Sequence, residues 1–286
     1  MAVIDLHTHT TASDGTNTPT ENVRLAKKKG LQAIAITDHD TVSGLEEGLE
    51  AGRQLGVEVI PGIEISTLRH GQDVHVLGYY IEYQQQGLQQ ELKKLRNVRA
   101  KRNELMVARL NELGIDITME EVKAKQTQPE GNVGRPHMAE VLMDKGIVHS
   151  MEEAFEQYLG REGKAYVNPP RISPEDAVRL ILRYGGIPVL AHPGLYDDDP
   201  LIEELAAIGL KGIEVFHPDH TDSEVDKYSR MAKELHLIAT GGSDYHGERN
   251  GQVFHSDLGS QPVPREALEH LKQMKQAQDE QAKKEL

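Results

Sequence analysis

Short apolar runs rich in β-branched residues alternate with helical patterns along most of the chain. Each run is long enough for one buried strand, and this alternation is typical of repeated β/α units around a mostly parallel sheet. The predicted strands are Ala2–His7, Ala33–Asp38, Val57–Glu64, Val74–Tyr80, Ile187–His192, Gly212–Phe216 and Leu237–Thr240. Seven strands of this kind predict an α/β protein built as a β/α barrel.

Hydroxyl and proline residues mark where several helices begin. Thr18 precedes Pro19, and Ser173 precedes Pro174. A hydroxyl at the N-cap accepts a backbone N–H of the first turn, and proline suits the first helical position. A third helix is expected to begin after Thr221 or Ser223.

The region between residues 88 and 165 contains helical patterns but no strand pattern. Its predicted helices are Leu88–Leu113, Met119–Ala124, Pro136–Asp144 after Arg135, and Met151–Leu159 after Ser150. We interpret residues 96–165 as an all-helical insertion in a barrel domain formed by residues 1–95 and 166–286. The insertion is expected to act as a lid that determines substrate specificity, with a merely packed appendage as the alternative.

Composition excludes several classes of function. The 286 residues carry 32 Lys and Arg against 46 Asp and Glu, a net charge of −14, and they include no Cys. Such an acidic chain is not expected to bind duplex DNA or anionic membranes. Without cysteine it has no disulfide framework, thiolate zinc site or Cys nucleophile. Because no long apolar run and no basic leader is evident, we expect a cytoplasmic protein without a membrane span.

Histidines and carboxylates gather near the ends of the predicted strands. The set consists of His7, His9, Asp14, His39, Glu64, His75, His192, Asp244 and His246. The C-terminal ends of parallel barrel strands open on one face, so we expect these side chains to converge there. Clustered carboxylates repel one another unless cations neutralise them. Nitrogen and oxygen ligands suit Mn²⁺, Zn²⁺ or Fe²⁺, so the pattern predicts two or three divalent metal ions.

These motifs resemble those of the PHP (polymerase and histidinol phosphatase) superfamily. They are DLHTHTTASDGT, ITDHDTVSG, PGIEIS, VHVLGY, LAHP and GGSDYH, in the family's order. The segments GRPHMAEVL and AFEQYLGREGKAYV resemble the insertion of stand-alone PHP phosphoesterases. The resemblance implies a distorted, TIM-like (β/α)7 barrel with three metal ions, manganese first and iron or zinc as alternatives. The implied ligand sets are His7, His9, Glu64 and Asp244; Glu64, His75 and His192; and Asp14, His39 and His246.

The same resemblance implies an activity. Similar members remove phosphate from nucleotides, notably the 3′-phosphate of adenosine 3′,5′-bisphosphate, and some trim short 5′-phosphorylated RNA. A hydroxide that bridges two metal ions and is held by Glu64 is the expected nucleophile. His217 or His220 is the candidate acid for the leaving group. Asp38 is expected to orient a metal-binding imidazole rather than to bind metal itself.

Basic residues of the insertion are candidates for binding the substrate. Arg135 opens a predicted helix, where its guanidinium and the helix N-terminus suit a phosphate. Arg161 and Lys164 are further candidates. By contrast, the helical face shared by Arg96, Arg99 and Arg102 is interpreted as solvent-exposed. Tyr79, Tyr80 and Tyr166 are candidates for stacking on a base.

Three alternatives remain open at this level. A phosphatase for a small metabolite such as histidinol phosphate needs less cover than the long insertion supplies. An amidohydrolase also begins with H-x-H in a barrel, but it does not need so many carboxylates. A non-catalytic PHP module is expected to have lost ligands, whereas all nine are present. The sequence does not indicate an oligomeric state.

Overall fold

A seven-stranded sheet curls into a nearly closed barrel at the centre of the computed structural model, which describes residues 4–126, 131–249, 251–253 and 255–284. The strands follow the chain order around the sheet: β1 (Ile4–Asp5), β2 (Ala33–Ile36), β3 (Glu58–Arg69), β4 (Gln72–Tyr79), β5 (Ile187–Leu190), β6 (Gly212–Phe216) and β7 (Ile238–Gly241). All seven predicted strands are present, although Ala2 and Val3 lie outside the described residues. The distorted (β/α)7 barrel is therefore confirmed.

The first and last strands meet through a few contacts rather than a regular ladder. The backbone N–H of Leu6 donates to the carbonyl oxygen of Gly241 at 3.2 Å, and Thr8 forms an isolated parallel bridge with Tyr245. Buried side chains from every strand except β6, together with Leu268 and Leu271, fill the interior below this point. The barrel interior is thus a packed core, and the ends of the parallel strands are where such a barrel builds its site.

Strand β4 runs antiparallel to both of its neighbours, β3 and β5. His75 therefore pairs with Ser66, beyond Glu64 on β3, and lies at the same end of the barrel as the other predicted ligands. Tyr79 and Tyr80 lie at the opposite end of β4. Tyr79 is fully buried and donates its hydroxyl to the carbonyl of Leu6. The prediction that these two tyrosines stack on a base is wrong, because the strand reversal carries them away from the site.

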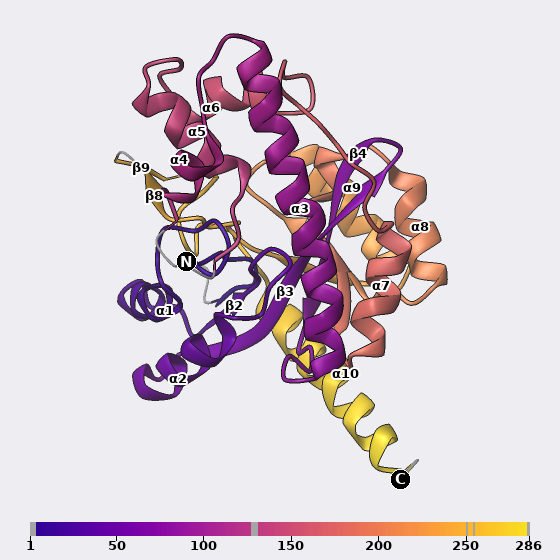
Figure 1. Cartoon of the computed structure of the whole chain (residues 1–286). Helices are drawn as coiled ribbons and strands as arrows, with labels where there is room; N and C mark the ends of the chain where they lie inside the picture. Colours follow the sequence, from indigo (N-terminus) through magenta and orange to yellow (C-terminus); the bar gives the residue numbers. More distant parts are fainter. Residues whose placement is uncertain (1–3, 127–130, 250, 254, 285–286) are drawn as a thin grey trace.

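Helices cover the outside of the barrel and its lower end (Figure 1). They are α1 (Pro19–Lys28), α2 (Leu45–Leu55), α7 (Pro174–Arg183), α8 (Asp199–Ala207), α9 (Asp222–Glu234) and α10 (Arg265–Lys284). The hydroxyls of Thr18, Ser173 and Thr221 each accept a backbone N–H three residues ahead, which confirms the predicted helix starts. A short hairpin of β8 (Glu248–Arg249) and β9 (Gln252–Val253) follows β7.

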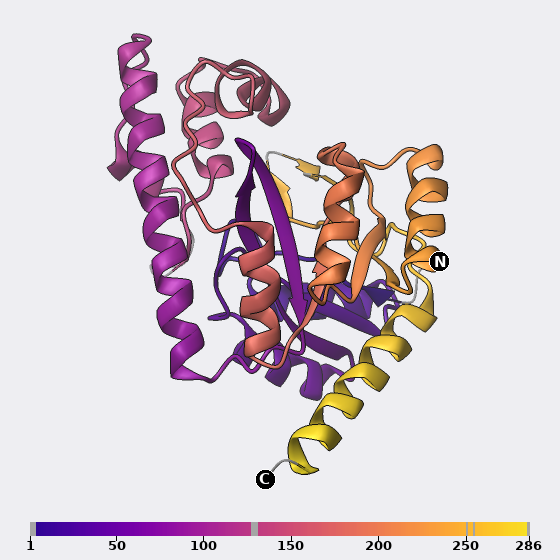
Figure 2. The same cartoon turned by 90° about the vertical axis from the view of Figure 1, so that its right-hand side faces the viewer.

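The helical block stands above the upper end of the barrel (Figure 2). It consists of α3 (Gln86–Glu112), α4 (Met119–Lys123), α5 (Arg135–Asp144) and α6 (Met151–Ala154), which continues as a π-helical turn over Phe155–Leu159. Helix α3 belongs to both parts, because Leu95 packs in the barrel's outer core and Met106 packs in a separate core of the block. This change of packing partners supports our proposal that residues 96–165 form an insertion domain.

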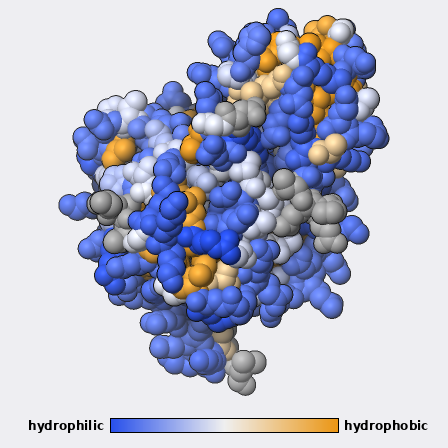
Figure 3. Space-filling model, turned by 90° about the vertical axis from the view of Figure 1, so that its left-hand side faces the viewer, coloured by the Kyte–Doolittle hydropathy of each residue, from blue (hydrophilic) through white to orange (hydrophobic). Residues whose placement is uncertain are grey.

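One face of the molecule is mainly hydrophilic. Figure 3 shows a face on which polar side chains predominate and apolar ones form small patches. Within the described part of the chain, no helix has the length and apolar character needed to cross a lipid bilayer.

Candidate metal centre and substrate cavity

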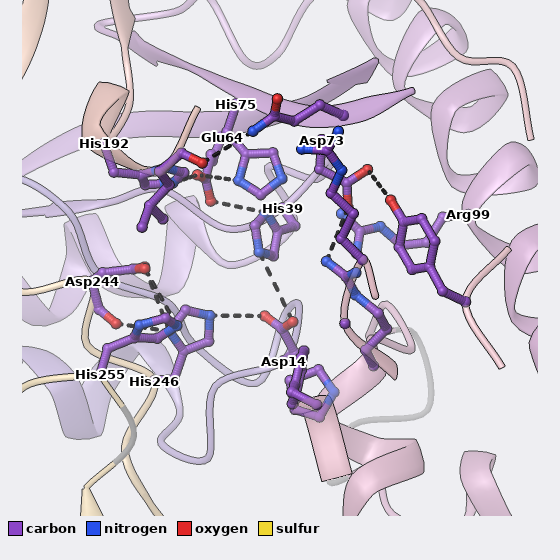
Figure 4. Close-up of a pocket in the computed structure, with 18 of the residues that line it drawn as sticks. Asp14, His39, Glu64, Asp73, His75, Arg99, His192, Asp244, His246 and His255 are labelled. Atoms are coloured by element: carbon purple, nitrogen blue, oxygen red, sulfur yellow. Dashed lines mark hydrogen bonds and ion pairs between the residues drawn. The ribbon is translucent and has the colours of Figure 1, made fainter. Parts of the chain in front are cut away.

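All nine predicted ligands converge at the upper end of the barrel, which we call the mouth. Figure 4 shows seven of them around one space: Asp14, His39, Glu64, His75, His192, Asp244 and His246. His7 and His9 lie beside them, with ring centroids 5.2 Å apart. Apart from His75, all nine are less than one tenth exposed. The strands therefore bring together residues that lie up to 239 positions apart in the chain.

Glu64 lies at the centre of this cluster. Its Oε2 is 3.4 Å from His7 Nε2, 3.2 Å from His9 Nε2 and 2.9 Å from His39 Nδ1. Its Oε1 is 2.8 Å from His75 Nδ1 and 3.2 Å from His192 Nε2. Each oxygen thus faces a different group of imidazoles, an arrangement that suits a carboxylate bridging two metal ions.

Two other carboxylates complete the cluster. Asp244 Oδ1 lies 3.3 Å from His7 Nε2 and 3.1 Å from His9 Nε2. Asp14 lies 3.4 Å from His246 Nε2 through Oδ1 and 3.9 Å from His39 Nε2 through Oδ2. Side-chain atoms of Asp14, His9, His39 and His246 approach one another closely enough to hold one ion. The contacts are compatible with all three implied ligand sets.

Unpartnered buried atoms provide an independent test of whether metal ions fit. Seven of the nine residues have a buried side-chain atom without a hydrogen-bond partner: His7 Nε2, His9 Nε2, Asp14 Oδ1, His39 Nδ1, Glu64 Oε2, His75 Nδ1 and Asp244 Oδ1. Buried polar atoms are rarely left unpaired, because desolvation without a partner is costly. Nitrogen and oxygen atoms that converge in this way fit several divalent cations, although they do not distinguish one metal from another.

Residues outside the predicted set orient the imidazoles. Glu214 accepts a hydrogen bond from His7 Nδ1 at 3.0 Å, and the Tyr196 hydroxyl lies 2.8 Å from His192 Nδ1. In both rings Nε2 is left facing the cluster. Glu214 also accepts the backbone N–H of His192 at 2.9 Å, where the backbone has a positive φ of 28°. The single acidic residue within the apolar strand GIEVF was a signal for Glu214, whereas no local pattern indicated Tyr196.

Asp38 stabilises the loop after β1. Its carboxylate accepts the backbone N–H and the hydroxyl of Thr10, both at 2.7 Å, and the hydroxyl of Ser13 at 2.6 Å. Ser13 Oγ in turn lies 3.5 Å from His9 Nδ1. Asp38 therefore contacts His9 only through Ser13, an arrangement compatible with the predicted role of orienting an imidazole.

Burial and neighbouring charges shift the pKa values of the cluster in opposite directions. Burial alone would raise the pKa of Asp14, Glu64 and Asp244, but the surrounding histidines lower it well below the usual value. Burial lowers the pKa of His39 and of His192 to about 4. The carboxylates and these two imidazoles are thus in the protonation states that bind metals. The neighbouring carboxylates instead raise the pKa of His7 and raise that of His9 to about 10, so these two rings would have to lose a proton to bind a metal ion.

A cavity of about 360 Å³ opens beside the cluster, between the barrel and the insertion. Its walls include Asp14, His39, Glu64, His75, His192, Asp244 and His246, and also Asp73, Arg99, Arg102, Arg135, Phe155, Arg161, Tyr166, Leu195 and His255. In Figure 4, Asp73 and Arg99 lie on one side of His39, and His192 and Asp244 lie on the other. The cavity therefore has a wall of potential metal ligands and a wall of guanidinium groups.

Of the three residues predicted to bind substrate, two line this cavity and one does not. Arg135 borders it, and its guanidinium is held 3.0 Å from Asp73 Oδ2. Arg161 also borders it and is largely exposed. Lys164 is exposed, is not among the lining residues, and lies over the ring of Tyr158. Tyr166, the remaining stacking candidate, lines the cavity next to Arg135.

The arginine face of α3 is turned toward the barrel, so the prediction of a solvent-exposed face is wrong. Arg99 is 8% exposed and donates to Asp40 Oδ2 through Nε at 3.0 Å and Nη2 at 2.9 Å. Arg102 is 3% exposed. Arg96 donates to the carbonyl of Asp40 at 3.0 Å. Helical spacing placed these residues on one face, but the packing of α3 on the barrel decided what that face contacts.

The histidines expected to act as acids lie behind the cavity wall. His220 uses both ring nitrogens on backbone groups, with Nδ1 donating to Val215 and Nε2 accepting from Gly194. His217 lies 3.5 Å from Asp244 Oδ2, but it is buried and is not among the lining residues. His255, which sequence reasoning missed, does line the cavity, with Nε2 also 3.5 Å from Asp244 Oδ2.

Comparison with known proteins agrees with this geometry. The family model of the PHP domain matches residues 5–183, which include six of the nine clustered ligands. The chain belongs to the PHP domain family. It is 36% identical over 264 residues to the 3′,5′-nucleoside bisphosphate phosphatase of Chromobacterium violaceum, which covers 90% of this chain and 92% of the relative.

Two further relatives and one solved structure are similar to this chain over most of its length. The chain is 33% identical to the phosphoribosyl 1,2-cyclic phosphate 1,2-diphosphodiesterase of Eggerthella lenta, over 88% of this chain and 96% of the relative. It is also 33% identical to the 5′-3′ exoribonuclease Rnm of Escherichia coli, over 85% of each protein. A solved structure described as a metal-dependent phosphoesterase of Bifidobacterium adolescentis superposes with a TM-score of 0.87 at 29% identity, over 95% of this chain and 96% of that one. The protein is a metal-dependent PHP phosphoesterase.

Proposed function

We propose that this PHP phosphoesterase acts on nucleotides, removing the 3′-phosphate of adenosine 3′,5′-bisphosphate and accepting short 5′-phosphorylated RNA as a longer substrate. The observation that carries the proposal is the cavity whose one wall is the ligand cluster and whose other wall contains Arg99, Arg102 and Arg135. Such a cavity suits a molecule with more than one phosphate. The C. violaceum and E. coli relatives act on nucleoside bisphosphates and on RNA, according to their names, which supports the same class.

The nine clustered residues would hold two or three divalent ions, for which we propose manganese, with iron or zinc as alternatives. Ions bound there would acidify a water molecule and neutralise charge on the phosphate oxygens. Glu64 lies between two groups of imidazoles and would bridge two of these ions. Glu214 and Tyr196 would hold the rings of His7 and His192 in the orientation that binds metal through Nε2.

The remaining walls would bind the organic part of the substrate. Phe155 and Tyr166 flank the Arg135 guanidinium, at 5.6 Å and 5.8 Å from their ring centroids, and supply apolar surface for a base. We propose Arg135 and Arg161 as contacts for phosphate oxygens. Lys164 belongs to this proposal only as a charge near the entrance, since it does not line the cavity.

We also propose that His255, rather than His217 or His220, donates a hydrogen bond to the leaving oxygen, because it alone of the three borders the cavity. The variant His255→Gln is expected to lower kcat for 3′-AMP by about 100-fold. Hydrolysis of p-nitrophenyl phosphate should fall much less, since its leaving group needs little protonation. Equal losses on both substrates would argue against this role.

The experiment that tests the function is phosphate release after chelation and re-addition of Mn²⁺. The substrates are adenosine 3′,5′-bisphosphate, 5′-AMP, histidinol phosphate and a short 5′-phosphorylated RNA. We expect a clear preference for the bisphosphate or the RNA, and inactive but folded His9→Ala and Asp244→Ala variants. Preference for histidinol phosphate would move the enzyme to the small-metabolite class, and an inactive wild-type protein would favour a non-catalytic module.

A further inference from the structure

Arg102 is a buried cation for which the described residues supply no carboxylate partner. It lies on α3, is 3% exposed and borders the cavity. Among the described residues, no acidic oxygen lies within 4.0 Å of its guanidinium. Its hydrogen bonds go from Nη2 and Nε to the side-chain oxygen of the adjacent Asn103, at 3.2 Å and 3.4 Å. A neutral amide oxygen does not balance a full positive charge.

The neighbouring arginines use the carboxylates that lie nearby. Arg99 pairs with Asp40 and also donates to the hydroxyl of Ser66, whereas Arg135 and Arg171 share Asp73. Arg102 thus adds a surplus positive charge to this wall. Burial and the charges of Arg99, Arg135 and Arg171 hold the pKa of Arg102 well below its usual value, and the charge of Asp73 opposes them only in part.

An unpaired buried guanidinium lowers the stability of the folded protein, because no ion pair offsets the free-energy cost of removing its charge from water. It is kept at a binding site when a ligand supplies the missing negative charge. A guanidinium presents several N–H donors in a planar fork that matches the oxygens of a phosphate. The cavity connects this fork with the ligand cluster at the mouth.

We propose that Arg102 is the centre of a second anion subsite, which binds the phosphate that is not hydrolysed when a bisphosphorylated substrate lies in the cavity. Arg99 and Arg135 border the same cavity and would limit where this phosphate sits. This inference rests on the proposed function and adds to it the residue that distinguishes a bisphosphate from a monophosphate.

The kinetic test compares two substrates that differ only in the second phosphate, adenosine 3′,5′-bisphosphate and 3′-AMP, with Mn²⁺-loaded enzyme. Arg102→Met should lower kcat/KM for the bisphosphate by about 10- to 100-fold. The loss on 3′-AMP should be below about threefold, and Arg102→Lys, which keeps the charge but not the fork, should lie between. Equal losses on both substrates, or none on either, would overturn the proposal.

Lys101→Gln is the matched control. Lys101 precedes Arg102 on the same helix, its side chain is 63% exposed, and it pairs with Glu104 at the surface. This variant removes the same charge at almost the same place in the chain. We expect its preference for the bisphosphate to equal that of the wild-type protein. A loss of preference as large as that of Arg102→Met would show that overall charge is responsible, and the subsite would be rejected.

A thermal test needs no turnover and therefore separates this inference from the proposed function. The metal-free wild-type protein is heated with and without sodium sulfate, alongside Arg102→Met. We expect Arg102→Met to be at least as stable as the wild type without sulfate, and to gain less from sulfate. A clear fall in its Tm without sulfate would show that Arg102 has a structural partner, and an equal gain from sulfate would show that no anion binds there. Either result would overturn the inference even if the wild-type enzyme proved inactive on both nucleotides.

Discussion

Glu214 illustrates how a single buried side chain prepares the metal centre. It is fully buried in β6, and burial alone would raise the pKa of its carboxyl group. The nearby His7, His217 and His192 instead lower this pKa, so that the carboxylate remains charged. A charged acceptor on Nδ1 fixes the tautomer of a metal-binding imidazole and increases its basicity.

The first prediction concerns this residue. Glu214→Gln keeps the shape of the side chain but removes its charge, so we expect Mn²⁺ affinity to fall by about 10- to 100-fold. Isothermal titration calorimetry on the metal-free protein measures this directly. Glu234→Gln, at the exposed end of α9, is the control and should bind Mn²⁺ as the wild type does. Unchanged affinity in Glu214→Gln would show that His7 does not depend on this hydrogen bond.

At the scale of elements, the start of α5 is built directly onto the metal centre. Asn132 donates its side-chain amide to the carbonyl of His39 at 2.6 Å, and its backbone N–H donates to Ala12 at 3.1 Å. Gly134, the N-cap of α5, lies so close to Asp14 that an added Cβ would come within 2.5 Å of Asp14 Oδ2 and 3.1 Å of its Cβ. The insertion is therefore in contact with residues proposed to bind metal.

A second prediction follows for Gly134→Ala. The new methyl group should displace the carboxylate of Asp14, a proposed metal ligand, so the effect should fall on metal binding more than on folding. We expect the protein to lose at least one bound Mn²⁺ per chain and about tenfold or more in kcat. Metal content by mass spectrometry and Tm by circular dichroism are the measurements. Full metal content together with normal activity would show that Asp14 accommodates the added methyl group without losing its metal ion.

At the scale of the whole molecule, Asp73 joins the insertion to the barrel. It lies on β4, at the mouth, and pairs with Arg135 of α5 and with Arg171, which precedes α7. The hydroxyl of Tyr166 also donates to it, at 3.3 Å. Burial alone would raise the pKa of Asp73, but the charges of Arg135 and Arg171 lower it well below the usual value.

The third prediction uses this pKa shift. Asp73→Asn leaves two arginines without their carboxylate, so we expect it to lower the free energy of unfolding by about 3 kcal/mol at pH 7. Because the pKa of Asp73 is lowered on folding, its contribution is complete above the ordinary value of 3.8 and is lost as the pH falls through the lowered value. The difference between variant and wild type should therefore shrink in acid.

Urea denaturation at pH 7 and at a series of acidic pH values measures this difference. Asp257→Asn is the matched control, because Asp257 pairs with Lys29 at the surface and is 55% exposed. We expect the control to change the free energy of unfolding by about 0.5 kcal/mol or less. A pH-independent difference for Asp73→Asn would show that packing, rather than the ion pairs, connects the insertion to the barrel.

The strands, the helix starts and the set of converging ligands were determined by the sequence itself. Apolar runs, N-cap hydroxyls such as Thr18 and Ser173, and the placement of His7 and Asp244 near strand ends are local signals, and each depends on the chemistry of a few adjacent residues. The family resemblance supplied the division of these ligands into three metal sites. These features were therefore predictable before any tertiary contact was known.

Only the tertiary structure decided the direction of β4, the environment of the α3 arginines and the partners of the metal centre. Periodicity records which side chains share a face, but not which element will cover that face. For this reason Arg102 was mistaken for a surface residue, Tyr79 was placed at the wrong end of the barrel, and His255 was missed. The environment of each of these residues depends on packing between segments far apart in the chain. A local sequence pattern does not indicate which distant residues will bury a side chain or lie close to its charge.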